Sequence, residues 1–271
     1  MSKDNRGRYT SKLNASTRQT AQLLLLKPTL HRLLRVHVHG ASHLDGLEPS
    51  PFIVYSNHSS HLDAALILSA LPGRLARHVA TGAAADFFYD KWWKAGPMSL
   101  FFNSFPIDRP HGSRSGQGGG KGARGMAASL LSDGVPLLIF PEGTRSRTGA
   151  MGPFKPGVAS LCIAHGAPAI PVALVGAYEA WPRTQKHLPR GRPHVHVVIG
   201  RPLAPKPGEI AHELNERMRR TVLEQHDVTA RAYGVKTLAE YARIEALEKA
   251  ANSEISDLAK EARKRAEQED Q

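Results

Sequence analysis

The sequence predicts an α/β fold in which a layered mixed sheet is flanked by helices. Along the middle of the chain, short apolar runs typical of buried strands alternate with segments of helical character. That alternation is typical of layered α/β domains. A basic, leucine-rich segment precedes this region, and a charged helical extension follows it. We therefore expect three parts: an N-terminal amphipathic segment at 1–35, the sheet domain at 36–205 and the extension at 206–271.

Four strands and two helices are predicted inside the sheet domain. The strands are expected at Phe52–Tyr55, Leu137–Phe140, Ala169–Val175 and His194–Ile199, and the helices at Leu62–Leu71 and Gly157–His165, with Gly166 just past the second helix. Ligand sites in such sheets collect where strands end and loops begin. The polar residues that follow the first two predicted strands are therefore candidates for a ligand site.

The two ends of the chain have a different character. Leu23–Leu26 lies among basic residues, and this pattern is typical either of a helix in a membrane interface or of a helix packed on the domain. Residues 209–225 and 235–268 are charged and helical. Their narrow apolar seam favours a solvated helix docked along the domain over a coiled coil. The segment 112–125, rich in Gly and Ser, is expected to be a flexible connector because it fails the phosphate-loop pattern in detail.

Composition sets further bounds. At 271 residues the chain has room for one sizeable domain with appendages, and 41 % hydrophobic with 22 % charged residues is ordinary for a globular protein. The single cysteine, Cys162, excludes an internal disulfide and fits a buried thiol in a reducing compartment. Met1–Thr10 lacks the apolar core of a secretory signal. The uncharged stretch from Pro156 to Tyr178 is interrupted by prolines and glycines, so we expect core elements there rather than a membrane span.

Positive charge is concentrated in the first two parts of the chain. Residues 1–205 hold 24 Lys plus Arg against 10 Asp plus Glu, a net charge of +14, whereas residues 206–271 hold 12 against 14, a net charge of −2. Nucleic acid, an anionic membrane surface or acidic substrates such as phospholipids and coenzyme A could each explain the excess. No recognised nucleic-acid motif is found, so we expect no nucleic-acid partner.

Four short stretches carry the chemistry. They are Asn57–Asp63, Phe105–Arg109, Phe140–Arg145 and Ile170–Val172, in that order. The first pairs a His with an Asp five residues later, which suits a general base and the carboxylate that orients it. The second and third each end in an Arg, which suits phosphate binding. No Gly-x-Ser-x-Gly elbow occurs, so the attacking oxygen is expected to come from the substrate.

In these motifs the chain resembles the glycerolipid acyltransferase superfamily, the family of 1-acyl-sn-glycerol-3-phosphate acyltransferases. The resemblance covers roughly residues 50–205 and includes the continuation Gly152–Gly157. It implies an O-acyltransferase of phospholipid biosynthesis that moves a fatty acyl group from acyl-CoA or acyl-carrier protein to lysophosphatidic acid. No cofactor is implied beyond the acyl donor. It also implies a peripheral position on an anionic membrane, expected on the cytoplasmic face.

The resemblance assigns the site residues. His58 is expected to be the catalytic base and Asp63 its orienting partner, while Arg109, Arg145 and Lys155 are candidates for holding the acceptor phosphate. Acceptor binding is further expected of the turn at Glu142, Gly143 and Thr144, and Pro171 is expected to contribute either to the site or only to a strand start.

Several alternatives stay open. Arg109 and Arg145 could instead form ion pairs with Asp108 or Glu142. His58 and His61 could share a zinc ion, although no third ligand lies at a suitable spacing, so no metal is expected. The acceptor could be another lysolipid, an aminolipid or a glycolipid, because the His–Asp chemistry is the same for each. The aromatic residues at 87–93 could line a membrane or an acyl chain, or could pack in the core.

Overall fold

The structure, a computed structural model, describes residues 7–48, 50–84, 100–107, 119–185 and 187–269. Its centre is a seven-stranded sheet with the strand order β1-β7-β6-β2-β5-β3-β4. The strands are β1 (Arg35–His39), β2 (Ile53–Ser56), β3 (Ala80–Ala84), β4 (Phe105–Ile107), β5 (Leu137–Ile139), β6 (Ala169–Val175) and β7 (His194–Ile199). Five neighbouring strands, from β6 to β4, are parallel, whereas β7 runs antiparallel to β6 and β1 runs parallel to β7. The predicted mixed sheet is confirmed.

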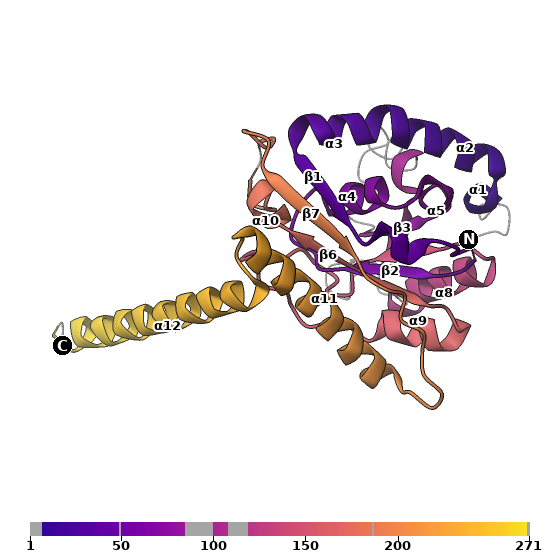
Figure 1. Cartoon of the computed structure of the whole chain (residues 1–271). Coiled ribbons are helices and arrows are strands. Elements are labelled where there is room, and N and C mark those ends of the chain that lie inside the picture. Colours follow the sequence, from indigo (N-terminus) through magenta and orange to yellow (C-terminus); the bar gives the residue numbers. More distant parts are fainter. Residues whose placement is uncertain (1–6, 49, 85–99, 108–118, 186, 270–271) are drawn as a thin grey trace.

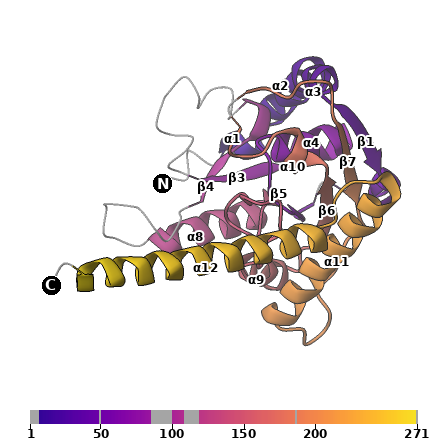
Figure 2. The same cartoon turned by 90° about the vertical axis from the view of Figure 1, so that its left-hand side faces the viewer.

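Helices cover both faces of this sheet (Figures 1 and 2). One face carries α3 (Lys27–Leu33), α4 (Asp63–Ala70) and α5 (Gly73–Ala76), and the other carries α8 (Gly119–Ser132), α9 (Gly157–His165) and α11 (Ala211–Tyr233). Shorter helical turns are η3 (Ala41–Leu44) and α10 (Ala177–Ala180). The arrangement is the one expected when a parallel sheet must bury both of its faces.

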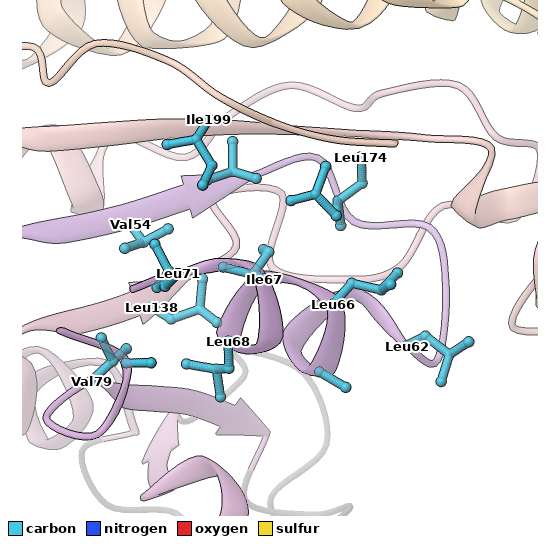
Figure 3. Packing of buried hydrophobic residues seen from close by; sticks show 14 of the residues in the cluster. Val54, Leu62, Leu66, Ile67, Leu68, Leu71, Val79, Leu138, Leu174 and Ile199 are labelled. Atoms are coloured by element: carbon cyan, nitrogen blue, oxygen red, sulfur yellow. The ribbon is translucent and has the colours of Figure 1, made fainter. Parts of the chain in front are cut away.

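The central strands are apolar because no side of them meets water. Every residue of β2, β5 and β6 is buried. Helix α4 packs on them through Leu66 and Ile67, both fully buried, and Figure 3 shows these side chains meeting Val54 and Leu174 from the sheet. Truncating such a leucine to alanine typically costs about 2–5 kcal/mol. This packing fixes where α4 begins, and therefore where Asp63 lies.

The predicted elements of the sheet domain are found within one or two residues of their expected ends. The second predicted helix ends at Gly166, whose φ of +59° suits a glycine just past a helix. Strands β1, β3 and β4 were not predicted. The first, RVHVH, alternates valine with histidine, the second, ATGAA, contains only small residues, and the third, FPI, is only three residues long.

The N-terminal segment packs on the domain and also exposes leucines. It forms α1 (Gly7–Thr10), α2 (Lys12–Ala21), the π-helical turn η2 (Gln22–Leu26) and α3. The buried Arg18 guanidinium donates to the Asn103 side chain at 2.9 Å and to the Arg77 carbonyl at 2.6 Å. Leu23, Leu24 and Leu25 are 50 %, 68 % and 57 % exposed. One face of the segment is therefore packed on the domain, and the position of the other face at a membrane stays a prediction.

The C-terminal extension has two unlike helices. Helix α11 contributes Leu214, Met218 and Val222 to the core beneath the sheet, so it belongs to the packed body. Helix α12 (Leu238–Glu269) then leads away from that body (Figure 1). The sequence predicted a flexible connector at 112–125. This prediction is wrong for residues 119–125, which form the start of α8, and residues 112–118 lie outside the described residues. No described helix is both long and apolar enough to cross a bilayer.

A stack of histidines joins β1 to β7. His37 and His39 of β1 alternate with His194 and His196 of β7, with ring centroids 4.7–5.4 Å apart. Tyr233 from α11 closes the stack at 3.9 Å from the His196 ring, and Arg35 lies beside His194. Burial, followed by the neighbouring histidines, lowers the pKa of His196 to about 4.

We predict that this stack destabilises the fold in acid. The folded pKa of His196 lies below its value of 6.5 in the unfolded chain, so the unfolded state binds the extra proton as the pH falls between these values. The free energy of unfolding should therefore fall by about 1–3 kcal/mol from pH 6.5 to pH 4 on account of this group. Urea unfolding at several pH values should show a smaller acid loss for His196→Asn, and an unchanged loss would contradict the assignment.

Candidate active site

The candidate site lies at the carboxyl edge of the parallel strands. The loop from 57 to 62 connects β2 to α4, and the loop from 140 to 156 connects β5 to α9. Since β2 and β5 are paired in parallel, both loops leave the sheet at the same edge. The Ser146 N–H donates to the His58 carbonyl at 2.7 Å and joins the two loops directly.

His58 and Asp63 form the pair that the sequence predicts. The His58 Nδ1 lies 2.7 Å from Asp63 Oδ2. A carboxylate accepts, so the ring proton belongs on Nδ1 and the lone pair of Nε2 is left to accept a proton. The His58 side chain is 21 % exposed while that of Asp63 is fully buried. The imidazole can therefore be reached from outside while its partner is held in the protein.

Asp63 is fixed by more than the imidazole. The same Oδ2 accepts the backbone N–H of Ser59 at 2.7 Å and of Ser60 at 2.8 Å. Asp63 is also the first residue of α4, where the positive end of the helix dipole favours a carboxylate. The five-residue spacing follows from this turn, because the loop folds back over the first residue of the helix. The geometry holds one oxygen in the middle of three donors.

Asn57 anchors the other side of the loop. Its side-chain amide donates to the Leu174 carbonyl at 3.0 Å and its oxygen accepts the Leu174 N–H at 2.9 Å. The buried side chain thus continues the pairing of β2 with β6 by one step. His58, the next residue, begins its loop from a fixed point.

The His58 ring lies on Phe140. The ring centroids are 4.0 Å apart and the planes are 15° from parallel. Phe140 ends the predicted strand 137–140 and follows β5. The stack and the bond to Asp63 together restrict the imidazole to one plane. Sequence reasoning identified the motif that contains Phe140 but assigned no role to this side chain.

Glu142 is a buried clamp between the two loops. Its Oε1 accepts the His58 backbone N–H at 2.7 Å and its Oε2 accepts the Gly152 N–H at 2.8 Å. Burial raises the pKa of Glu142 to about 7, against the lowering effect of those two hydrogen bonds. Both oxygens are occupied by backbone groups. This places Glu142 behind His58 as a support for its loop.

Gly143 and Lys155 lie together in the turn after Glu142. Gly143 has φ of +72°, and a Cβ built there would lie 2.7 Å from Lys155 Nζ. The Lys155 side chain therefore crosses directly over the glycine, and its backbone N–H donates to the Pro141 carbonyl at 2.9 Å. Any side chain at 143 would displace this amine. Thr144 is exposed in the same turn.

Arg145 lies beside the His58 loop. Its Nη1 donates to His61 Nδ1. The alternative ion pair of Arg145 with Glu142 is not formed among the described residues, and both Glu142 oxygens accept backbone N–H groups. Arg109 falls outside the described residues, as do Asp108 and the aromatic residues at 87–93.

Pro171 lies deeper in the sheet than the other predicted residues. It is buried in β6 and pairs with Tyr55 of β2, and Tyr55 lies three residues before His58 in the sequence. Its carbonyl accepts the Gly200 N–H at 2.8 Å, just beyond the last paired residues of β6 and β7. The N and C=O of one strand residue point to the same side, so the N–H that proline lacks is missing on the β7 side. The pairing of β6 with β2 is therefore complete. Pro171 thus lies within the strand, and its contribution to the site stays a prediction.

Other reactive groups are separate from this site. Burial raises the pKa of the Cys162 thiol to about 12 in the middle of α9, so the thiolate is disfavoured. Among the described residues, no group of three His, Cys, Asp or Glu side chains is arranged to hold a metal ion. The pair His58–Asp63 therefore remains the candidate for catalysis at this sheet edge.

We predict that Glu142→Gln loosens the site. A carboxyl group offers lone pairs on both oxygens, whereas the amide nitrogen offers none, so either the His58 or the Gly152 N–H loses its acceptor. The expected loss of unfolding free energy is about 1–3 kcal/mol at pH 5, with lower turnover. Urea unfolding with Glu254→Gln, an exposed residue of α12, serves as the control, and equal effects of both changes would refute the clamp.

The same variant has a predicted pH signature. Because the folded pKa of Glu142 is about 7 and its unfolded value 4.5, the wild type loses stability as the pH rises between these values. The variant has no such group. The gap in stability between the two proteins should therefore shrink from pH 4.5 to pH 7.

The chain is similar in sequence to known acyltransferases. Residues 35–175 match the family model described as Acyltransferase. The chain is 28 % identical over 214 residues to 1-acyl-sn-glycerol-3-phosphate acyltransferase alpha from Bos taurus and from Homo sapiens; these matches cover 78 % of this chain and 69 % and 70 % of the relatives. It is 32 % identical over 130 residues to 1-acyl-sn-glycerol-3-phosphate acyltransferase from Cocos nucifera, covering 48 % of this chain and 39 % of that protein.

A solved structure shares the fold. The 1-acyl-sn-glycerophosphate (LPA) acyltransferase PlsC from Thermotoga maritima superposes with a TM-score of 0.60 at 23 % identity, covering 75 % of this chain and 76 % of that one. The family model spans just over half of the chain and includes the sheet edge, His58, Asp63 and the turn at 142–145. The chain belongs to the acyltransferase family and is an O-acyltransferase.

Proposed function

We propose that this protein transfers a fatty acyl group from an acyl thioester to the free hydroxyl of lysophosphatidic acid, giving phosphatidic acid. The observation that carries the proposal is the 2.7 Å contact of His58 Nδ1 with buried Asp63, which leaves Nε2 as a base. The named relatives are acyltransferases of 1-acyl-sn-glycerol-3-phosphate, which supports this acceptor.

In the proposed first step the acceptor hydroxyl loses its proton to His58 Nε2 while its oxygen attacks the thioester carbonyl carbon. The imidazolium that forms lies against Asp63, whose charge stabilises it and whose position keeps the ring oriented. The Asp63 oxygen already accepts two backbone N–H groups, so it need not move during the transfer. Folding already fixes the side chains of His58 and Asp63, so little conformational entropy is lost when the substrate reacts.

In the second step the tetrahedral intermediate collapses and its carbon–sulfur bond breaks. His58 Nε2 returns the proton to the departing thiolate, which leaves as the thiol of coenzyme A or of acyl-carrier protein. The new ester bond joins the acyl group to the acceptor oxygen. No protein nucleophile is acylated, which fits the absence of a serine elbow from the sequence.

The acceptor phosphate is held by cations at the same sheet edge. Arg145 lies on the neighbouring loop, one residue from the backbone bond of Ser146 to His58, and Lys155 lies over Gly143 in that loop. Guanidinium groups bind phosphate through two parallel hydrogen bonds. In this proposal Arg109 assists them.

The protein is further proposed to sit on the cytoplasmic face of an anionic membrane. Leu23, Leu24 and Leu25 are exposed in a row on η2, and Lys27 and Arg32 lie on α3 directly after it. Apolar side chains flanked by cations suit the boundary between lipid headgroups and acyl chains. Such a position would bring the site to a lipid acceptor.

We predict that His58→Ala lowers kcat by about 10³-fold or more and that Asp63→Asn lowers it by about 10²–10⁴-fold, because each removes part of the base. Product mass spectrometry with one labelled acyl thioester and a panel of lysolipid, aminolipid and glycolipid acceptors measures both rate and acceptor choice. His212→Ala, at an exposed position of α11, is the control. Full activity of folded His58→Ala would exclude the mechanism, and preference for an acceptor without phosphate would exclude the acceptor.

We predict that Leu24→Glu together with Leu25→Glu weakens membrane binding. Co-sedimentation with vesicles containing phosphatidylglycerol should fall by about tenfold or more, because two exposed leucines no longer enter the interface. Ser253→Glu, exposed on α12, adds negative charge elsewhere and should change binding little. Equal sedimentation of the double variant and the wild type would place the membrane contact on another surface.

A further inference from the structure

His61 is held by contacts that have no part in the proton transfer. Its backbone N–H donates to the Trp181 carbonyl at 3.3 Å, and its Nε2 lies 3.3 Å from the Arg183 carbonyl. Its Nδ1 receives the Arg145 Nη1 donor. The residue lies three positions after His58 in the same loop, yet its ring is turned toward two arginines from other segments.

These contacts fix the tautomer of His61. A guanidinium can only donate, so Nδ1 must accept and carries no proton. The single proton of the neutral ring is then on Nε2, where it donates to the Arg183 carbonyl. A protonated ring would place an N–H and a positive charge against the Arg145 donor. Only the neutral form of His61 can therefore accept this hydrogen bond from Arg145.

The charges around His61 favour that neutral form. Burial, followed by the Arg145 charge, lowers the pKa of His61. Arg183 lowers it further, while the bond to the Arg183 carbonyl and the charge of Asp63 act in the opposite direction. Asp63 is already bonded to His58 and to two backbone N–H groups.

Arg183 is tied to the same place. Its Nη1 donates to the Arg145 carbonyl at 3.1 Å. The segment around it is joined to the His58 loop by the Ser60 hydroxyl, which donates to the Trp181 carbonyl at 2.8 Å, and by a bridge between Ser60 and Pro182. The Arg145 guanidinium and the Arg183 backbone carbonyl thus contact one neutral imidazole next to the proposed base, and the charges of both arginines act on that ring. None of the four sequence motifs includes Arg183.

We propose that His61 is a positioning residue that seats Arg145, and that Arg183 supplies the second cation of an anion subsite for the phosphate monoester of the acceptor. This rests on the proposed function for the identity of the acceptor. The phosphate monoester carries close to two negative charges at neutral pH. Two guanidinium groups match that charge, whereas a phosphodiester headgroup would match only one of them.

The first test separates binding from chemistry. His61→Leu removes the acceptor of the Arg145 bond and should raise the KM for lysophosphatidic acid about tenfold, with kcat and the KM of the thioester nearly unchanged. His61→Asn keeps an oxygen close to the position of Nδ1 and should restore a KM near that of the wild type. Arg145→Ala and Arg183→Ala should also raise this KM, and Arg183→Lys should raise it less.

Controls show whether the effect belongs to the phosphate. The same variants should leave the KM for monoacylglycerol, which lacks phosphate, within about twofold of the wild type, and His212→Leu should change neither KM. A loss of kcat for both acceptors in His61→Leu, or no rescue by His61→Asn, would make His61 merely structural. An unchanged KM in Arg183→Ala would remove Arg183 from the subsite.

A binding measurement keeps this inference distinct from the proposed function. Calorimetry with a lysophosphatidic acid analogue that lacks the free hydroxyl needs no turnover. Weaker binding of the analogue by His61→Leu and Arg183→Ala would support the subsite even if the wild type acylated no phosphate acceptor. Equal binding by all variants would overturn it even if lysophosphatidic acid were the substrate.

The tautomer gives a pH signature. As the pH falls, protonation of His61 releases Arg145, so the KM for lysophosphatidic acid should rise more steeply for the wild type than for His61→Asn. Ionisation of the substrate phosphate is the same in both proteins and cancels in the comparison. The charged groups that face the ring are Arg145, Arg183 and Asp63. Parallel pH profiles would show that His61 does not titrate against Arg145.

Discussion

A single buried oxygen organises the site. Asp63 Oδ2 accepts hydrogen bonds from His58 Nδ1 and from the backbone N–H groups of Ser59 and Ser60, and each of the three nitrogen atoms lies within 2.8 Å of this oxygen. These three bonds fold the loop back over the first turn of α4 and aim the imidazole outward at the same time. The position of Asp63 depends in turn on α4, whose leucines are packed against the centre of the sheet. Catalytic geometry is thus a consequence of core packing.

A second acidic residue, Glu142, holds the backbone of the same loop. Glu142 connects the backbone of His58 to that of Gly152, so the loops from β2 and β5 move as one unit. The two acidic residues differ in what they contact: Asp63 accepts the ring N–H of His58 and two backbone N–H groups, whereas Glu142 accepts only backbone N–H groups. The motif that contains Glu142 therefore supplies the carboxyl group that holds the His58 backbone and also the Arg145 that we propose as a phosphate ligand.

The sequence predicted much of this fold. The apolar runs of β2, β5 and β6 are visible because strands buried on both faces have few polar positions, and β7 is visible from its run Val197–Ile199. β3 was missed because ATGAA has little apolar bulk, and β4 because FPI is only three residues long; β3 pairs with β5, and β4 pairs with β3. β1 was missed because its histidines alternate with valines and stack only on those of β7. Residues 119–125 read as a loop because glycine weakens helix propensity, yet they are helical in α8.

The sequence alone determined which chemical groups are available. A His five residues before an Asp, two arginines at motif ends and no nucleophilic elbow are local facts, and they predict a base, its partner and the kind of substrate. The tertiary structure decided which groups meet. Phe140 beneath the imidazole, Glu142 on the His58 backbone and Arg183 beside Arg145 come from segments far apart in the chain. Spacing along a sequence reports neighbours within one turn or helix, whereas contacts across a sheet edge exist only once the strands have paired and the helices have packed.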